Sequence, residues 1–408
     1  MRSAIDRTKW AAMVVGCFLV FGGCSEEDEE NAETPEENDE NQNIVDNDWE
    51  PPLVWSYPDP YVDGDEVDWV VETGATYARL PAVDADGGLV FGDWKGVLRR
   101  VNADTGDVSW EFEAQGRIDA APAIGDDGSI YFGDWSGVVY ALDAQGDELW
   151  TYDTGAIVDV SPTIDGDGKI WVGDDAGFVH VLSPQGDLED SIDLEAPITS
   201  AVSISIDGGD WRAYVATADD SVHCLTDVDE RTSAVLQGQV GVDVAIAPNG
   251  DALVTTDNGG LARLDEQCDV IWEEDRTWAT LMPAAIAGEG QMWVWGHNRQ
   301  MYRIDIDTGS TEHQEGAPIR GNATTAPVVA DDGRVLVSTR GVVYFDGDDA
   351  GILTRLDAMD APVLVDGAAI VNTERGAVLR LAGDWPALGD SSWPTQHGNL
   401  ARTGRVEH

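Results

Sequence analysis

The sequence predicts an all-β protein, an eight-bladed β-propeller built from four-stranded blades. Two observations carry this prediction. A turn of the form Gly-Asp-x-x-Gly recurs at residues 92–96, 133–137 and 173–177, with spacings of 41 and 40 residues. Short β-branched and aromatic runs lie between turns, and no helical periodicity of useful length occurs between residues 66 and 390. Four short strands in about 40 residues are typical of a propeller blade.

Each copy has the same order of elements. A proline opens a short apolar strand, and an Asp-Gly pair then makes a tight hairpin, because glycine adopts the positive φ that this turn requires. A second strand leads into the Gly-x-x-x-Gly turn, and a third follows it, as in residues 138–142. We expect the glycines of this turn to be structural: Gly92, Gly96, Gly133, Gly137, Gly173 and Gly177.

Weaker copies extend the repeat to eight. Residues 216–225 align without a gap with residues 173–182, and later copies lie at 255–264, 283–309, 327–344 and 362–381. The eighth copy lacks a tryptophan-bearing outer strand, but residues 68–74 match this element. We therefore expect an N-terminal strand to complete the last blade and close the ring, which removes open sheet edges. The tryptophans expected to be structural are Trp69, Trp110, Trp150 and Trp272.

Residues 103–110 resemble the tryptophan-docking segment of the quinoprotein-type, or PQQ-like, repeat family. Residues 393–404 also resemble a terminal motif common in these proteins, so the resemblance covers roughly residues 66–404. It implies that each outer-strand tryptophan packs between blades. By architecture alone it extends to BamB-like lipoproteins of the outer-membrane protein assembly machinery. A propeller hosts many activities, so the resemblance is specific for fold and poor for function.

The N-terminal residues predict export. A basic start, an apolar run and small residues indicate a signal peptide over residues 1–23, and residues 21–24 resemble a bacterial lipobox in which Cys24 is acylated. A plain signal peptide with an incidental cysteine is the alternative. Residues 24–50 are rich in Glu, Asp and Asn, which predicts a disordered acidic tether. The propeller is expected over residues 51–408. The resemblance to other lipoproteins, in which Asp after the cysteine often signals inner-membrane retention, implies that Ser25 favours the outer membrane. The periplasmic and the surface face of that membrane both stay as alternatives.

The charge excludes one class of partner. The chain has 78 acidic and 23 basic side chains, a net charge of −55. Nucleic acid binding needs lysine and arginine against phosphates, so it is not expected. Solubility, or repulsion from other acidic surfaces, explains the charge most simply, and a basic or divalent-cation partner is the sharper alternative.

The cysteines and histidines do not predict catalysis. The chain lacks the adjacent cysteines of PQQ dehydrogenases and the Cys-x-x-Cys-His of haem attachment. The histidines have no metal-ligand spacing, so we expect no metal centre and no cofactor. Asp-rich turns such as residues 165–168 leave weak calcium binding open, although a hairpin needs the same residues. Cys224 and Cys268 could form a disulfide in an exported protein, or remain free.

One loop position could form a binding site. Counting three residues before each blade's first strand selects Ala78, Asp119, Asp159, Thr199, Asp243, Thr280, Thr324 and Met359, which should ring one mouth of the channel. The nearby arginines are Arg79, Arg117, Arg276 and Arg320. Such a ring could bind a cation or a basic segment. Alternatively, its Asp and Thr side chains only satisfy backbone groups in the turns.

The leading hypothesis is a non-enzymatic, monomeric, outer-membrane lipoprotein whose propeller binds or scaffolds an envelope protein. A PQQ- or small-ligand-binding enzyme is the second hypothesis, and a surface structural protein is the third. The sequence names no partner.

Overall fold

The chain divides into two units, Met1–Ser56 and Tyr57–His408. The structure, a computed structural model, describes residues 67–79, 81–207, 210–226, 231–240, 243–276, 282–288, 290–296, 298–316, 326–339, 341–346, 349–354, 360, 362–365, 367–373, 376–383, 385–388 and 405–407. All of them lie in the second unit. The expected signal peptide, Cys24 and the acidic tether lie outside the described residues, as does the terminal motif at 393–404.

Eight sheets make up the described part of the second unit, each with four antiparallel strands, and the described residues contain no helix. Blade 1 contains β2 (Ala82–Val83), β3 (Gly88–Gly92), β4 (Val97–Asn102) and β5 (Val108–Glu113); blade 2 contains β6 (Ala123–Ile124), β7 (Ile130–Gly133), β8 (Val138–Leu142) and β9 (Glu148–Asp153). Blade 3 contains β10 (Thr163–Ile164), β11 (Ile170–Gly173), β12 (Phe178–Leu182) and β13 (Leu188–Asp193); blade 4 contains β14 (Ser203–Asp207), β15 (Asp210–Thr217), β16 (Ser221–Leu225) and β17 (Arg231–Val235).

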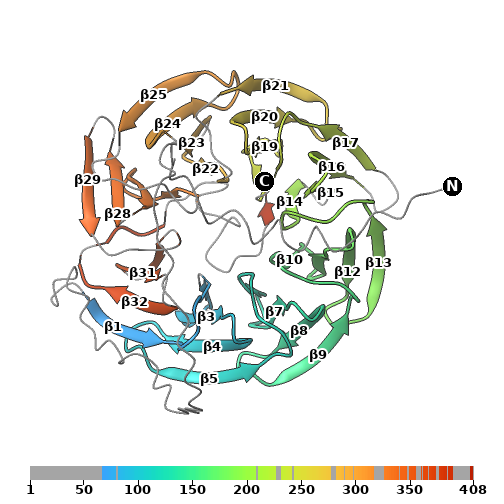
Figure 1. Ribbon diagram of the computed structural model, residues 1–408, viewed down its shortest axis with the longest axis vertical. Helices are drawn as coiled ribbons and strands as arrows, with labels where there is room; N and C mark the ends of the chain where they lie inside the picture. The colour runs from blue at the N-terminus through green and yellow to red at the C-terminus, as the bar shows by residue number, and fades with distance from the viewer. Residues whose placement is uncertain are drawn as a thin grey trace, which may run out of the picture. The chain divides into compact units, whose positions relative to one another are not determined.

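The second half of the ring repeats this order. Blade 5 contains β18 (Ala245–Ile246), β19 (Ala252–Thr255), β20 (Gly260–Leu264) and β21 (Val270–Asp275); blade 6 contains β22 (Ala285–Ile286), β23 (Gln291–Trp295), β24 (Gln300–Asp305) and β25 (Thr311–Gly316). Blade 7 contains β26 (Val328–Val329), β27 (Val335–Ser338), β28 (Val342–Asp346) and β29 (Asp349–Thr354); blade 8 contains β30 (Val363–Val365), β31 (Ala368–Asn372), β32 (Ala377–Leu381) and β1 (Val67–Glu72). Figure 1 shows the fourth strand of each blade at the rim of the ring.

The predicted closure is confirmed. β1 pairs antiparallel with β32, with Val70 opposite Leu379, so a strand from the start of the domain completes the last blade. The eight-bladed all-β fold expected from the repeats is thereby confirmed. Blade 4 differs from the others, because a short strand, β33 (Arg405–Glu407), adds a fifth member to its sheet.

The hydrophobic core lies between blades. One cluster joins Leu98 of blade 1 to Phe132 of blade 2, and another joins Ile170 of blade 3 to Val139 of blade 2. At the closure, Ile370 of blade 8 packs with Phe91 of blade 1. Each interface buries the apolar faces of two neighbouring sheets, so the ring is stabilised around its whole circumference by burial of apolar surface.

The recurrent turn joins one blade to the next, as blade 2 illustrates. A Cβ on Gly133 would lie 2.1 Å from Cγ1 of Val158, which enters from the next blade's loop, and Gly137 has a φ of +90°. The carboxylate of Asp134 is fully buried, and its Oδ1 accepts the N–H of Ser136 at 2.8 Å. The turn therefore needs small residues and a buried acceptor at fixed positions. The other predicted turn glycines have the same surroundings: Gly92, Gly96, Gly173 and Gly177.

The second oxygen of the turn aspartate takes a different partner in each blade. Asp134 Oδ2 accepts the hydroxyl of Tyr140 at 3.0 Å, and Asp174 Oδ2 lies 3.0 Å from Nε2 of His180. In blade 4 a threonine, Thr217, replaces the aspartate and contacts His223. Both histidines therefore stand in strands beside a turn residue of their own blade.

The outer-strand tryptophans dock on the neighbouring blade. The indole N–H of Trp110 donates to the carbonyl of Ala144 at 3.1 Å, and a Cβ on Gly146 would lie 2.6 Å from the Trp110 ring. The same bond, 34 residues ahead in sequence, is made by Trp69 to Ala103, Trp150 to Pro184 and Trp272 to Ile306. The repeat spacing thus positions both the donating tryptophan and the glycine whose lack of a side chain leaves space for the indole ring.

Blades 4 and 5 are also joined covalently. Cys224 on β16 and Cys268, in the turn between β20 and β21, form a disulfide with a Cα–Cα distance of 5.7 Å. Both residues are buried in one apolar cluster.

Candidate functional site: an aromatic and charged cluster at the mouth

Two kinds of segment meet at the ends of the blades, at the place predicted to form one mouth of the channel. In blades 1 to 5, the loop entering the blade lies beside the turn between its second and third strands, and one backbone bond joins them. The N–H of Trp94 donates to the carbonyl of Tyr77, that of Trp135 to Arg117, and that of Asp175 to Ile157. Because this bond recurs, blades differ mainly in the side chains they present here. We call Tyr77, Arg79, Trp94, Arg117, Asp119, Trp135, Asp159 and Asp175 the mouth cluster.

Arg117 lies over two indole rings. Its guanidinium carbon is 3.1 Å from the ring centroid of Trp135 and 4.6 Å from that of Trp94. Tyr77 extends the aromatic row, with its ring centroid 5.2 Å from that of Trp94. A guanidinium over an indole is attracted to the negative face of the ring, and each such contact contributes about 0.5–2 kcal/mol.

Asp119 organises these residues. It accepts Nη2 of Arg79 at 2.7 Å on one oxygen and Nη2 of Arg117 at 2.7 Å on the other. The indole N–H of Trp94 donates to it at 2.9 Å. Asp119 is buried, so these three charge-assisted or polar bonds compensate the loss of its hydration.

Residues of blade 8 form hydrogen bonds with the first residues of the cluster. The hydroxyl of Tyr77 donates to Asp360 at 3.4 Å, and Asp360 in turn accepts Nδ2 of Asn372 at 2.6 Å. Asn372 also donates to the carbonyl of Ala78 at 2.7 Å. Burial, followed by the charge of Asp360, raises the pKa of Tyr77, so it stays a neutral donor. These bonds cross the seam where the ring closes, so closure positions the first residues of the cluster.

Asp159 and Asp175 of blade 3 complete the cluster. Neither forms an ion pair among the described residues, and the charge of Arg79 is a minor influence on Asp159. Burial, reinforced by the charges of Asp175 and Asp119, raises the pKa of Asp159 to about 6. Partial burial, with the charge of Asp174, also raises the pKa of Asp175. Removal of charged groups from water and the proximity of like charges both favour the protonated acid. An incoming cation would relieve this cost.

The predicted ring of loop residues separates into two groups. Asp119 and Asp159 belong to the mouth cluster. Thr199 instead donates to the carbonyl of Val240 at 2.7 Å, and Asp243 accepts the N–H of Ala201 at 3.0 Å. These two satisfy backbone groups between neighbouring loops. Ala78 is buried under the cluster. Thr280, Thr324, Met359 and Arg320 lie outside the described residues.

The predicted arginines also divide. Arg79 and Arg117 meet on Asp119. Arg276 instead donates to the carbonyl of Gly309 and to Oγ1 of Thr311, both in blade 6.

The aromatic half of the cluster was not expected from the sequence. Only four outer-strand tryptophans were singled out there, as structural residues, whereas Trp94 is 40% exposed and Trp135 is half-buried in a turn. Their position was a usable signal, because both are the third residue of a Gly-Asp-Trp-x-Gly turn. A residue at the tip of a turn faces the end of a blade and not the space between sheets.

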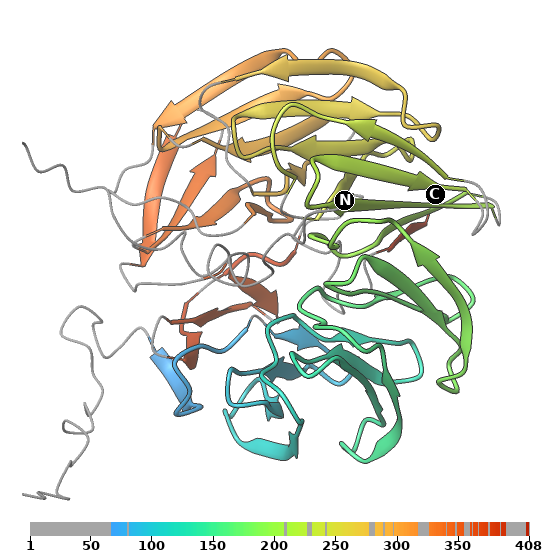
Figure 2. The same cartoon turned by 45° about the vertical axis from the view of Figure 1, so that its right-hand side comes forward.

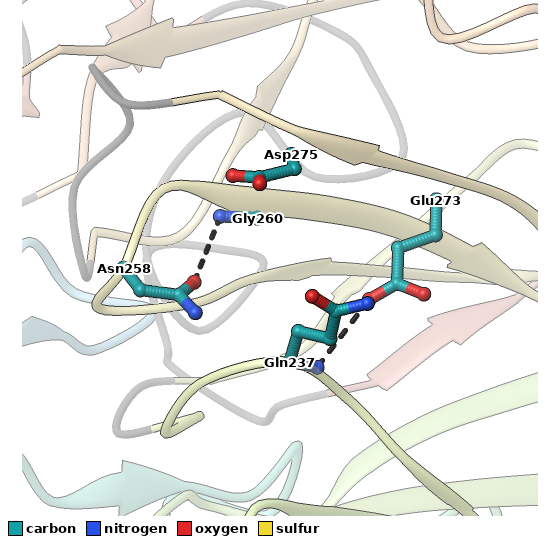
Figure 3. Close-up of a pocket in the computed structure, with 5 residues that line it drawn as sticks. All are labelled: Gln237, Asn258, Gly260, Glu273 and Asp275. Carbon is teal, nitrogen blue, oxygen red and sulfur yellow. Dashed lines mark hydrogen bonds between the residues drawn. The ribbon is translucent and has the colours of Figure 1, made fainter.

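A small pocket lies on blade 5 (Figure 3). Its volume is about 100 Å³, and Gln237, Asn258, Gly260, Glu273 and Asp275 line it. The N–H of Gln237 donates to Glu273, and that of Gly260 to Asn258, each at 3.3 Å. Pockets for organic ligands usually enclose about 300 Å³ or more, so this one suits water or a small ion.

The Asp-rich turn proposed for calcium is engaged in backbone and indole bonds. Asp165 Oδ1 accepts the N–H groups of Asp167 and Lys169, each at 2.9 Å, and its Oδ2 accepts the indole N–H of Trp171. Across the described part of the chain, no group of three or more His, Cys, Asp or Glu side chains is placed to hold a metal ion. No helix within the same residues is long and apolar enough to cross a membrane.

The fold and the mouth cluster define a closed eight-bladed β-propeller with the PQQ-like repeat architecture. A family model described as outer membrane protein assembly factor BamB matches residues 94–187. That segment runs from Trp94 to the turn before β13, the last strand of blade 3, and holds six of the eight cluster residues.

Solved structures show the same fold. BamB from Moraxella catarrhalis is 14% identical, with a TM-score of 0.63, and the match covers 78% of this chain and 99% of that one. The computationally designed Ika8 protein matches equally, with 14% identity, a TM-score of 0.63, and coverage of 78% and 100%. No curated protein matches the sequence. Both similarities are to the fold alone.

Proposed function

We propose that this protein is a non-enzymatic, lipid-anchored propeller of the bacterial outer membrane that binds an envelope protein through its mouth cluster. The BamB-like propeller architecture supports a protein-binding role. The particular surface is inferred from the chemistry at the mouth.

One observation carries the choice of surface: an arginine over two indoles, beside two carboxylates that no described cation pairs with. Tryptophan, tyrosine and arginine dominate the binding energy of protein interfaces because they supply large, rigid contact area together with polar groups. Trp94 is partly exposed and held by Asp119, so it is preorganised for contact.

The partner chemistry follows from the charges. Asp119 is already neutralised by two arginines, whereas Asp159 and Asp175 retain unpaired negative charge. A lysine or arginine of a partner segment would pair with these two carboxylates and place its apolar stem near Trp135. We therefore propose that the partner presents a basic, extended or loop segment. The strongly acidic surface would also speed its approach.

The export signals support the location. The lipobox at residues 21–24 would place a lipid on Cys24, and the acidic residues 24–50 would form a spacer between membrane and propeller. We propose the same domain division as the sequence predicts, with a signal peptide at 1–23, a tether at 24–50 and the propeller at 51–408.

Site-specific photocrosslinking in cells tests the surface. A photoreactive phenylalanine analogue replaces Trp94 at the mouth or, as a control, Val270, which is 44% exposed on the outer strand β21. We expect a discrete crosslinked product from position 94 only, reduced at least five-fold by the double substitution Asp159→Asn and Asp175→Asn. Equal products from both positions, or none from position 94, would contradict the proposal.

A further inference from the structure

Blade 4 departs from the repeat at its inner strand. The first strand of blades 1, 2, 3, 5, 6 and 7 is two residues long. In blade 4 the corresponding strand, β14, has five residues, and its hairpin partner β15 has eight. The hairpin between Ser203 and Thr217 is therefore longer than a blade requires.

The extra length of β14 carries another strand. β33 pairs with it in parallel, with Ile204, Ser205 and Ile206 opposite Arg405, Val406 and Glu407. Figure 1 shows this strand, in red, beside β14 on the inner side of the ring, and Figure 2 shows the same sheet from a turned view. No other sheet described in the structure has a fifth strand.

The pairing has the properties of a docked peptide. β14 already pairs with β15 along one edge, from Ser203 to Asp207, so only its inner edge is left for β33. A strand edge offers backbone N–H and C=O groups that pair with any extended chain. The ladder spans three residues and is parallel, the arrangement that is slightly less stable per residue. A ladder this short is weak, and its closure depends on the high effective concentration of a segment in the same chain.

We propose that the inner edge of β14 is a strand-docking site for an extended peptide, occupied in cis by Arg405–Glu407, and that it binds the same segment when that segment is supplied as a separate peptide. The resident strand is thus a releasable ligand and not an obligatory part of blade 4. This inference is independent of the mouth cluster, because it rests on backbone pairing in blade 4 and uses no residue of blades 1 to 3.

The test uses the full-length chain and a labelled peptide with the sequence of residues 401–408. Successive N–H groups of a strand point to opposite edges, so either Val406 or Glu407 donates toward β14. The double substitution Val406→Pro and Glu407→Pro removes both donors and releases the resident strand. The matched control, Val406→Ala with Glu407→Ala, retains both N–H groups and keeps the strand docked.

Fluorescence anisotropy measures peptide binding. We expect saturable binding to the proline variant, at least ten-fold tighter than to the wild type or the alanine variant. A peptide carrying the same two prolines should not bind. If the proline variant and the wild type bind the peptide equally, or neither binds it, the proposal is wrong.

Hydrogen exchange gives a second measurement without added peptide. In the wild type and the alanine variant, amides of residues 203–207 that face β33 are expected to be protected, and the proline variant should lose this protection at least ten-fold. Unchanged exchange over residues 203–207, in a proline variant whose melting temperature and circular dichroism match the wild type, would also overturn the proposal.

Discussion

The guanidinium of Arg117 lies 3.1 Å from the ring centroid of Trp135, although the two residues belong to segments 18 positions apart. A backbone bond from the Trp135 N–H to the Arg117 carbonyl, 3.0 Å long, fixes the pair at the mouth. The bond is part of the general blade pattern, whereas the side-chain contact is particular to blade 2. A general scaffold thus positions a specific chemical group.

Replacing Arg117 with lysine tests that contact. Lysine keeps the positive charge but loses the planar group that lies over two rings and bonds Asp119. We expect Arg117→Lys to lower the free energy of unfolding by about 1–2 kcal/mol in urea denaturation. The matched control is Arg334→Lys, in which an arginine 5.7 Å from Tyr344 and paired with Asp332 is changed far from the mouth. Only Arg117→Lys should also reduce crosslinking from position 94.

Asp159 is expected to make stability depend on pH. Its pKa is raised from 3.8 to about 6 in the folded protein, so between about pH 4 and 6 the folded state binds more protons than the unfolded state. Stability contributed by this group therefore falls as pH rises through that window. Asp159→Asn, which mimics the neutral acid, should be more stable than the wild type at pH 7 by about 2–3 kcal/mol, with the difference vanishing near pH 4.

Thermal or urea unfolding at both pH values measures this difference. Asp86, exposed in a hairpin turn, supplies the control, and Asp86→Asn should track the wild type at pH 4 and pH 7. A stability difference for Asp159→Asn that is the same at both pH values would refute the assignment.

Two glycine substitutions separate the stability contributed by tryptophan docking from the cost of backbone strain. Gly146 and Gly155 have φ values of +84° and +85°, but a Cβ on Gly146 would lie 2.6 Å from the Trp110 ring, whereas one on Gly155 would have nothing within 4 Å. Gly155→Ala should cost about 1 kcal/mol for backbone strain alone. Gly146→Ala should cost about 3 kcal/mol, because it also displaces Trp110 from the next blade. Equal losses in urea denaturation would mean that the docking contributes nothing.

The disulfide predicts sensitivity to reduction. Cys224 and Cys268 are 44 residues apart, and a cross-link of that span typically stabilises by about 2–4 kcal/mol. Dithiothreitol should therefore lower the melting temperature of the wild type and leave that of the Cys224→Ala, Cys268→Ala variant unchanged. Mass spectrometry of the purified exported protein, after alkylation without reductant, should find neither cysteine modified.

The sequence by itself determined the fold. The 41- and 40-residue spacing of the glycine turns predicted the blades, and the match of residues 68–74 to an outer strand predicted the closure with β32. These features are readable because they are local. A positive φ, a strand period or a docking tryptophan requires a certain residue at a certain spacing, whichever blade contains it.

Only the tertiary structure decided which side chains meet. Asp119 and Thr199 occupy the same repeat position, yet one binds two arginines and the other a backbone carbonyl. Nothing in the repeat distinguishes them, because the difference arises from neighbouring turns and from blade 8 across the closure. The pairing of β33 with β14 was equally invisible, since backbone groups pair without a side-chain code and the two strands lie far apart in sequence. Long-range contacts of this kind exist only once the ring has closed.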